Sequence, residues 1–220
     1  MPAQAQAESF RLAIERGDPR AVEAALQSDP GLANRTIRWY LKQQNESAPL
    51  HYVSDCVGNT WLTNGTEGEI AQLLVEHGAQ IDGTPGRESP LIAAASLGAS
   101  RVAKVLIDAG ANLELTSIFG ARALHWAAWT GAVPTVELLL GRGAAMEERC
   151  SEFGATPLFW AVHGYGPRGT QDKGGQVAAA RALIEAGARV ATANKYGESA
   201  LEMSKRCARQ DMYELLVRAG

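Results

Sequence analysis

Hydrophobic residues recur along the chain in two short phrases that alternate in a fixed order. The first phrase has a leucine after proline or alanine, and occupies residues 48–51, 89–92, 122–125, 156–159 and 199–202. The second phrase has branched apolar residues that lead to a glycine, and occupies residues 73–79, 105–111, 138–144, 182–188 and 215–220. Its glycines are spaced 32, 33, 44 and 33 residues apart. This near-constant spacing predicts an internal structural repeat.

Each repeat predicts a helix, a turn and a second helix. A hydroxyl residue followed by proline, as in Ser89-Pro90, starts a helix because the hydroxyl caps free backbone N–H groups and proline fits the first turn. Glycine ends the second helix, since it takes the left-handed conformation without a Cβ penalty. Small residues at 93–95 and 127–128 let neighbouring helix pairs approach closely, and one pair alone does not bury its apolar face. The pattern therefore predicts stacked helix pairs.

The two phrases resemble those of the ankyrin repeat, a unit of 33 residues with a Thr-Pro-Leu-His phrase and a closing Leu-Leu and Gly-Ala phrase. The resemblance covers nearly the whole chain and implies an all-α ankyrin-repeat solenoid of about six helix-turn-helix units in a single domain, residues 1–220. It also implies that the first helices and the loop tips line a concave side, where function usually sits. The expected parts are an N-terminal capping unit at 10–34, an extended connection at 35–47, central units at 48–83, 89–114, 122–148 and 156–191, and a C-terminal capping unit at 199–220.

Three segments depart from the repeat pattern. Within 35–47, the apolar residues Ile37, Trp39 and Leu41 alternate with other residues, which predicts a short strand near 37–41. Segments 57–67 and 164–176 are rich in glycine and stand where other repeats turn tightly between helices. We expect both to project as loops from the same edge, and the second to close as a lid over a bound partner.

Aromatic residues recur at equivalent positions of neighbouring repeats, on the predicted first helices and the loop tips. Helical spacing of three residues places two such positions on one face of each first helix. Contiguous exposed aromatic surface is typical of a binding site, although Trp126 and Trp160 could instead pack between the stacked helices. The candidate binding residues on or beside this surface are Tyr52, Asp55, Phe119, Trp126, Trp129, Phe153, Trp160, His163, Tyr165 and Tyr196.

Charge and cysteine content exclude several other classes of protein. With 21 basic and 24 acidic residues the net charge is −3, which does not favour a nucleic-acid binder or an anionic membrane surface. No apolar run reaches the roughly 18 residues that a membrane helix needs. Cys56, Cys150 and Cys207 lack the spacing of a disulfide framework or a zinc ribbon, which favours a reducing compartment. We expect a cytoplasmic protein that is a monomer.

No motif in the chain specifies an enzyme. The sequence has no phosphate-binding glycine loop after a strand, no His-Glu-x-x-His and no Gly-x-Ser-x-Gly, so we assign no catalytic residue, metal or cofactor. His51 and His125 belong to the Pro-Leu-His phrase, and the resemblance implies that they bond neighbouring loop backbone. His163 is different, because it lies on the predicted aromatic surface.

Two hypotheses of different class follow. The first is a non-enzymatic module that recognises a protein or peptide through the concave aromatic face of units four to six. The alternative is a small-molecule-binding protein or unusual enzyme, with a pocket at Trp126, Trp129, Trp160 and His163 covered by the 164–176 loop. A scaffold or immunity-type protein is a variant of the first hypothesis that the sequence does not separate from it.

Overall fold

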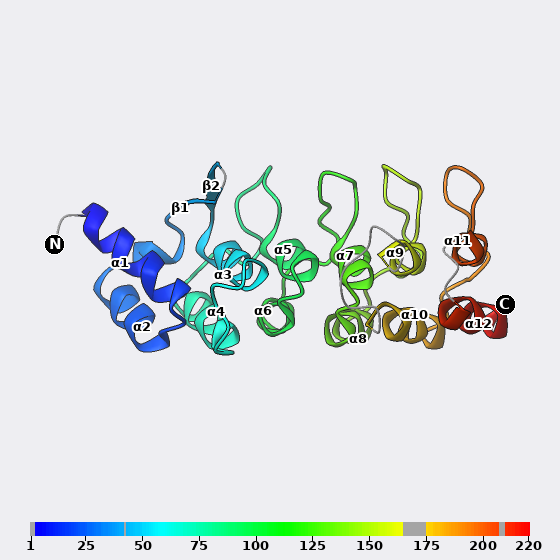
Figure 1. The fold of residues 1–220 in the computed structure, drawn as a ribbon. Coiled ribbons are helices and arrows are strands. Elements are labelled where there is room, and N and C mark those ends of the chain that lie inside the picture. The colour runs from blue at the N-terminus through cyan, green and yellow to red at the C-terminus, as the bar shows by residue number, and fades with distance from the viewer. Residues whose placement is uncertain (1–2, 42, 165–174, 207–209) are drawn as a thin grey trace. The chain divides into compact units, whose positions relative to one another are not determined.

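The computed structural model describes residues 3–41, 43–164, 175–206 and 210–220. These residues form helices joined by turns and loops, with one two-stranded sheet among them (Figure 1). The chain divides into two compact units, Met1–Asn112 and Leu113–Gly220, and each is described by itself. The observed helix pairs confirm the predicted fold class.

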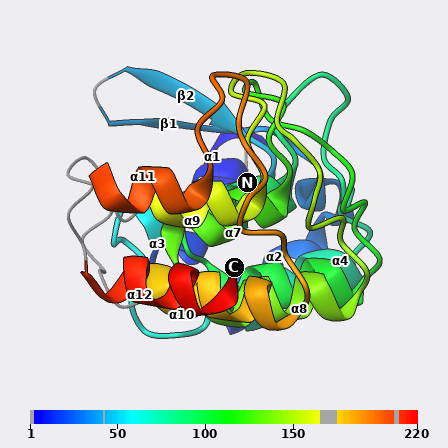
Figure 2. The same cartoon turned by 90° about the vertical axis from the view of Figure 1, so that its right-hand side faces the viewer.

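Unit 2 consists of three helix pairs. The first helices, α7 (Ala123–Thr130), α9 (Pro157–Gly164) and α11 (Ala200–Arg206), pack one on the next. The second helices, α8 (Val133–Gly141), α10 (Gly175–Glu185) and α12 (Gln210–Ala219), form a parallel row beneath them (Figure 2). The two rows enclose the hydrophobic core of this unit, in which Leu124, Val136, Leu139, Leu158, Leu183, Met212 and Leu216 are buried.

Local signals in the sequence fix where these helices begin and end. Thr156 Oγ1 accepts the Phe159 N–H at 3.4 Å at the start of α9. At the start of α11 a capping box forms, because Ser199 Oγ accepts the Glu202 N–H while Glu202 Oε2 accepts the Ser199 N–H. Gly143 and Gly187 follow the second helices with φ of 79° and 102°, the left-handed conformation that closes a helix.

Unit 1 contains three helix pairs and a hairpin. Its elements are α1 (Ala3–Glu15), α2 (Pro19–Ser28), the 3-10 helix η1 (Pro30–Ala33), β1 (Ile37–Tyr40), β2 (Gln44–Ser47), α3 (Pro49–Gly58), α4 (Glu67–Glu76), α5 (Pro90–Ser96) and α6 (Ser100–Asp108). Helix α3 packs on α5, and α4 packs on α2 and α6. The first helix begins at Ala3, although the sequence predicted the first unit from residue 10.

The predicted strand near 37–41 is confirmed as β1, which pairs antiparallel with β2 from Ile37 opposite Ser47 to Tyr40 opposite Gln44. Ile37 and Trp39 are buried, whereas Arg38 and Tyr40 are exposed, as the alternating pattern requires. The pairing strand was not predicted. Residues 59–66 form the expected loop between α3 and α4. Of the second insertion, residues 165–174 lie outside the described residues.

Candidate functional site

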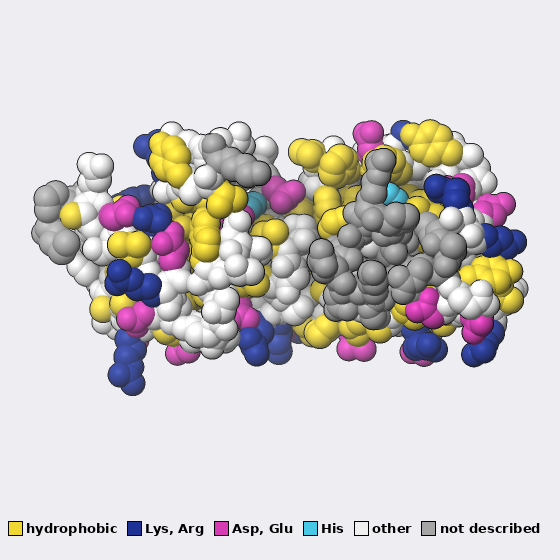
Figure 3. All heavy atoms as spheres, viewed as in Figure 1, with side chains coloured by type: hydrophobic (Ala, Val, Ile, Leu, Met, Phe, Trp, Pro, Cys, Tyr) yellow, Lys and Arg dark blue, Asp and Glu magenta, His cyan; other side chains and the backbone are white. Residues whose placement is uncertain are grey.

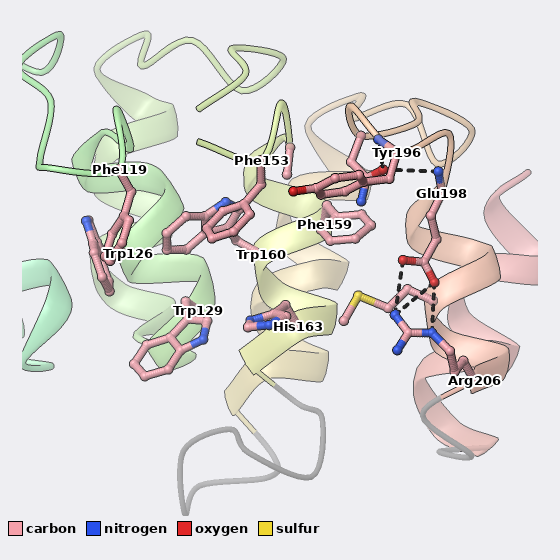
Figure 4. A pocket seen from close by; sticks show the side chains of 13 residues that line it. Phe119, Trp126, Trp129, Phe153, Phe159, Trp160, His163, Tyr196, Glu198 and Arg206 are labelled. Atoms are coloured by element: carbon pink, nitrogen blue, oxygen red, sulfur yellow. Dashed lines mark hydrogen bonds and ion pairs between the residues drawn. The ribbon is translucent and has the colours of Figure 1, made fainter. Parts of the chain in front are cut away.

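Unit 2 holds a cavity of about 470 Å³ between its loop tips and its first helices (Figure 4). Aromatic side chains supply most of its wall, and they come from all three repeats of the unit. On the face that Figure 3 shows, hydrophobic side chains gather over these loops and helices. We call this cavity the aromatic pocket, and it is lined by Phe119, Trp126, Trp129, Phe153, Ala155, Phe159, Trp160, His163, Asn194, Tyr196, Glu198, Met203 and Arg206.

The aromatic rings of the pocket hold one another in place. The ring centre of Trp126 lies 5.0 Å from that of Trp160 and 5.9 Å from that of Trp129, and both pairs meet edge to face. Phe119 lies 5.9 Å from Trp126 and 6.2 Å from Phe153. Edge-to-face pairs at these distances are favourable beyond the area that they bury. The wall is therefore assembled before any ligand arrives.

The indole N–H groups of the three tryptophans differ in their partners. Trp126 Nε1 donates to Ser117 Oγ at 3.2 Å, and Trp160 Nε1 donates to Cys150 Sγ at 3.4 Å. No described residue accepts a hydrogen bond from the indole of Trp129, whose nitrogen lies on the side of the ring that faces His163 in Figure 4. Trp126 and Trp160 thus offer the pocket mainly carbon surface, whereas Trp129 also offers a donor.

Two polar groups border the pocket near its aromatic wall. The guanidinium of Arg206 donates two hydrogen bonds to the carboxylate of Glu198. Its Nε donates to Oε1 and its Nη2 donates to Oε2, each at 3.0 Å. Partial burial and the positive charge of Arg206 lower the pKa of His163 below its usual value. His163 is therefore a neutral imidazole at pH 7, able to donate one hydrogen bond and accept another.

The loop tips are held by short-range hydrogen bonds that aim their aromatic side chains. Asn194 Oδ1 accepts the N–H groups of Tyr196 at 2.9 Å and Glu198 at 3.1 Å, which closes the turn that carries Tyr196. The Lys195 N–H donates to the Phe153 carbonyl at 3.0 Å and so links this turn to the preceding loop. Phe153 and Tyr196 are 37% and 72% exposed, so both rings form the outer rim of the pocket.

Seven of the predicted binding residues meet in the aromatic pocket: Phe119, Trp126, Trp129, Phe153, Trp160, His163 and Tyr196. Trp160 is only 6% exposed, so most of its ring packs inside the unit, as the alternative interpretation expected. The remaining part of its ring lines the pocket. Trp126 and Trp129 are half-buried. The role of these residues in binding stays a prediction, while their convergence on one cavity is observed.

Tyr52 is not available for binding, which corrects its assignment as a surface residue. Its ring is fully buried in unit 1, where it packs 5.9 Å from Trp39, and its hydroxyl donates to Glu15. Asp55 accepts from Ser47 Oγ at 2.7 Å, and burial raises the pKa of its carboxyl. Both residues belong to unit 1, and neither lines the aromatic pocket. Tyr165 lies outside the described residues, as does most of the predicted 164–176 lid.

Six lining residues were not among the predicted site residues: Ala155, Phe159, Asn194, Glu198, Met203 and Arg206. Two of them carried a signal, because Met203 and Arg206 occupy the repeat positions of Trp160 and His163. Their aliphatic and cationic side chains fall outside a search for aromatic residues. Glu198 has no such signal, since only the folded loop brings it to Arg206.

His125 has the structural role that was expected of it. Its Nε2 lies 3.1 Å from the Glu148 carbonyl and 3.2 Å from the Ala155 carbonyl, both in the neighbouring loop. His51 differs, because its Nε2 stands 3.7 Å from Asp55 Oδ1. Across the part of the chain that the structure describes, no three His, Cys, Asp or Glu side chains are grouped to hold a metal ion. No helix within the described ranges has the length and apolar character needed to cross a membrane.

Comparison with protein families gives a match over most of the chain. A family model described as "Ankyrin repeats (3 copies)" matches residues 10–117 and 124–220. The comparison with curated proteins found no match.

Proposed function

Since the chain belongs to the ankyrin-repeat family, whose repeats generally serve as protein–protein interaction modules, we propose that it is a non-enzymatic recognition protein that binds a protein or peptide through the aromatic pocket of unit 2. The observation that carries this proposal is the convergence of aromatic residues from three repeats on one cavity of about 470 Å³. Buried thiols at Cys56 and Cys150 fit the reducing cytoplasm as the place of this recognition.

The pocket binds one group of the partner, and the rim adds apolar contact around it. Rings that are already packed against one another lose little conformational freedom when a partner binds. The free energy gained when an apolar partner group leaves water is therefore offset only slightly by the cost of ordering the pocket. Exposed side chains on the loops, such as Ile118 at 87% and Tyr196 at 72%, extend the apolar surface beyond the pocket. Such a central aromatic cluster with an outer rim is typical of the residues that dominate binding energy at protein interfaces.

The lining residues favour binding over catalysis. Glu198 is held by Arg206, and His163 has neither a nucleophile nor a carboxylate within hydrogen-bonding distance among the described residues. General acid-base catalysis requires such a partner to pass the proton on.

Small-molecule recognition is a second candidate, and the size of the pocket favours it. A cavity of about 150 Å³ binds one benzene ring, and small-molecule sites range from roughly 300 to 1,000 Å³. At about 470 Å³ the aromatic pocket has room for a ligand of two or three rings.

The proposal is tested by comparing Trp129→Ala with Trp61→Ala in a capture experiment. Both tryptophans are half-buried, but Trp61 lies in unit 1 against Trp39, at 5.4 Å between ring centres. Partners captured from the native cytoplasm are identified by mass spectrometry, and their affinity is then measured with purified components. We expect Trp129→Ala to weaken binding about 30-fold, the effect of losing an interface anchor of roughly 2 kcal/mol. Trp61→Ala should leave the affinity unchanged.

Two other results would direct the function elsewhere. Partners that bind Trp129→Ala and the unchanged protein equally well would show that the aromatic pocket is not the recognition site. Recovery of a bound small molecule from the purified protein, lost in Trp129→Ala, would favour the second candidate.

A further inference from the structure

The charges around the aromatic pocket leave no carboxylate for a cationic guest among its described lining residues. The one acidic side chain, Glu198, is bound at both oxygens by Arg206. The Lys195 ammonium lies 5.2 Å from the ring centre of Tyr196, so a cation already sits beside the rim. The charged residues that line the pocket are thus one cation and one anion, Arg206 and Glu198, which are paired with each other. A cation leaving water for this cavity would meet, among the described lining residues, no carboxylate without a cationic partner to compensate its desolvation.

The surroundings of His163 also disfavour a positive charge in the pocket. Burial, together with the charge of Arg206, lowers the pKa of its imidazole, so a positive charge is disfavoured at this position. A guest ammonium group beside His163 would experience the same two effects.

The indole N–H groups of the three tryptophans differ in what they offer a guest in the pocket. Trp126 and Trp160 direct their indole N–H groups to Ser117 and Cys150, so their rings present carbon surface. The indole N–H of Trp129 and the imidazole of His163 lie near each other in Figure 4. A guest that matches the carbon surface and these two groups has an apolar body and a polar edge. A neutral guest also avoids the cost of desolvating a charge in a pocket where Arg206 and Glu198 are already paired.

We infer that the aromatic pocket takes a neutral aromatic side chain of the partner, tryptophan or tyrosine, and rejects alkylammonium side chains. This inference rests on the proposed protein-recognition function and specifies the group that the pocket selects. The guest ring packs against the aromatic wall, and its N–H or O–H meets Trp129 and His163. A tryptophan or tyrosine has both the apolar ring and the polar edge that such a site requires.

The test uses the full chain and four capped amino acids as probes: N-acetyl-tryptophanamide, N-acetyl-tyrosinamide, N-acetyl-leucinamide and N-acetyl-trimethyllysinamide. The signals of the indole N–H groups are followed by nitrogen-edited NMR. We expect the tryptophan and tyrosine probes to shift the Trp129 signal saturably, with a Kd on the order of 0.1–1 mM for ligands of this size. Trp39 and Trp61, which lie in unit 1, serve as internal controls and should not shift.

The leucine and trimethyllysine probes test whether the pocket prefers an aromatic, an aliphatic or a cationic group. We expect the leucine probe to bind at least about fivefold more weakly than the tryptophan probe, and the trimethyllysine probe to cause no saturable shift. Preferential binding of trimethyllysine would overturn the inference and identify a cation cage. The absence of any saturable shift with the aromatic probes at about 10 mM would overturn it as well.

A pair of arginine variants tests the role of charge. Arg206→Gln releases the Glu198 carboxylate, so the pocket should gain measurable binding of the trimethyllysine probe. Arg218→Gln is the matched control, because Arg218 is also exposed and pairs with Glu214 at 3.8 Å without lining the pocket. Equal behaviour of the two variants would contradict the charge argument.

Failure of this inference is distinguishable from failure of the proposed function. Aromatic probes that bind in the pocket, combined with a partner that is insensitive to Trp129→Ala, would disprove the proposed function and retain the pocket chemistry. A partner that depends on Trp129, combined with a pocket that prefers leucine or trimethyllysine, would disprove the inference and retain the function.

Discussion

At the scale of the residue, Trp129 and Trp160 show how neighbours decide what one side chain does. Trp160 is 6% exposed and packs against Trp126, Phe153 and His125, whereas Trp129 is half-buried. We expect Trp160→Ala to lower the free energy of unfolding by about 3–5 kcal/mol, the cost of deleting a core tryptophan. Trp129→Ala should cost about 1 kcal/mol. Chemical denaturation measures both, and an equally large loss at Trp129 would show that it is packing rather than binding surface.

His125 makes the stability of the fold depend on pH. It is fully buried, its Nδ1 accepts the Arg122 N–H at 3.2 Å, and its Nε2 donates to loop carbonyls, so only the neutral ring satisfies all these bonds. Burial lowers its pKa from 6.5 to about 4. Because the unfolded chain takes up this proton near pH 6.5, stability is retained above that pH and falls by about 3 kcal/mol as the pH drops to 4.

Urea unfolding at pH 7, 5.5 and 4 measures this dependence, with His125→Gln as the comparison. The variant should be less stable at pH 7, since glutamine does not reproduce all three hydrogen bonds, but its stability should fall less steeply toward pH 4. Parallel curves for the two proteins would mean that other groups cause the acid sensitivity.

At the scale of the element, helices α7 and α9 approach so closely that one position admits only glycine. A Cβ atom on Gly164, at the end of α9, would stand 2.1 Å from the carbonyl oxygen of Trp129, at the end of α7. We expect Gly164→Ala to force the helix ends apart, to cost about 1–3 kcal/mol of stability and to shift the Trp129 indole signal. Gly141→Ala in α8 is the control, because no atom lies within 4 Å of its added Cβ. The control should be neutral or slightly stabilising.

The hairpin shows which elements the sequence predicts and which it does not. Strand β1 was predictable because Ile37 and Trp39 alternate with polar positions. Strand β2 carries the sequence Gln-Asn-Glu-Ser and no apolar alternation, so its pattern resembles a loop. It is a strand because β1 offers it backbone partners and because Ser47 is bonded to Trp39 and Asp55. Such pairing is a tertiary effect that no single segment encodes.

At the scale of the whole molecule, the repeat predicted most of the candidate site. Equivalent positions of stacked repeats lie side by side, so a column of aromatic residues in the aligned sequence becomes one wall in space. The same rule placed Tyr52 on that wall and was wrong there, because α1 and β1 supply Glu15 and Trp39, which enclose its ring. The exposure of a side chain depends on which other elements pack against its repeat. The repeat pattern alone does not predict these elements.

Nearest-neighbour packing also predicts how stability is distributed along the chain. Helix α12 packs on α10 and α11 at one end of unit 2, whereas α9 packs on α7, α10 and α11. A helix with neighbours on both sides opens only when contacts with both are lost, so it opens less often than a terminal helix. We expect amide hydrogens of α12 to exchange at least about tenfold faster than those of α9, a difference of about 1.4 kcal/mol in opening free energy. Hydrogen exchange followed by mass spectrometry resolves the two helices, and exchange that is slowest in α12 would show that the terminal repeat, rather than the central ones, stabilises this unit.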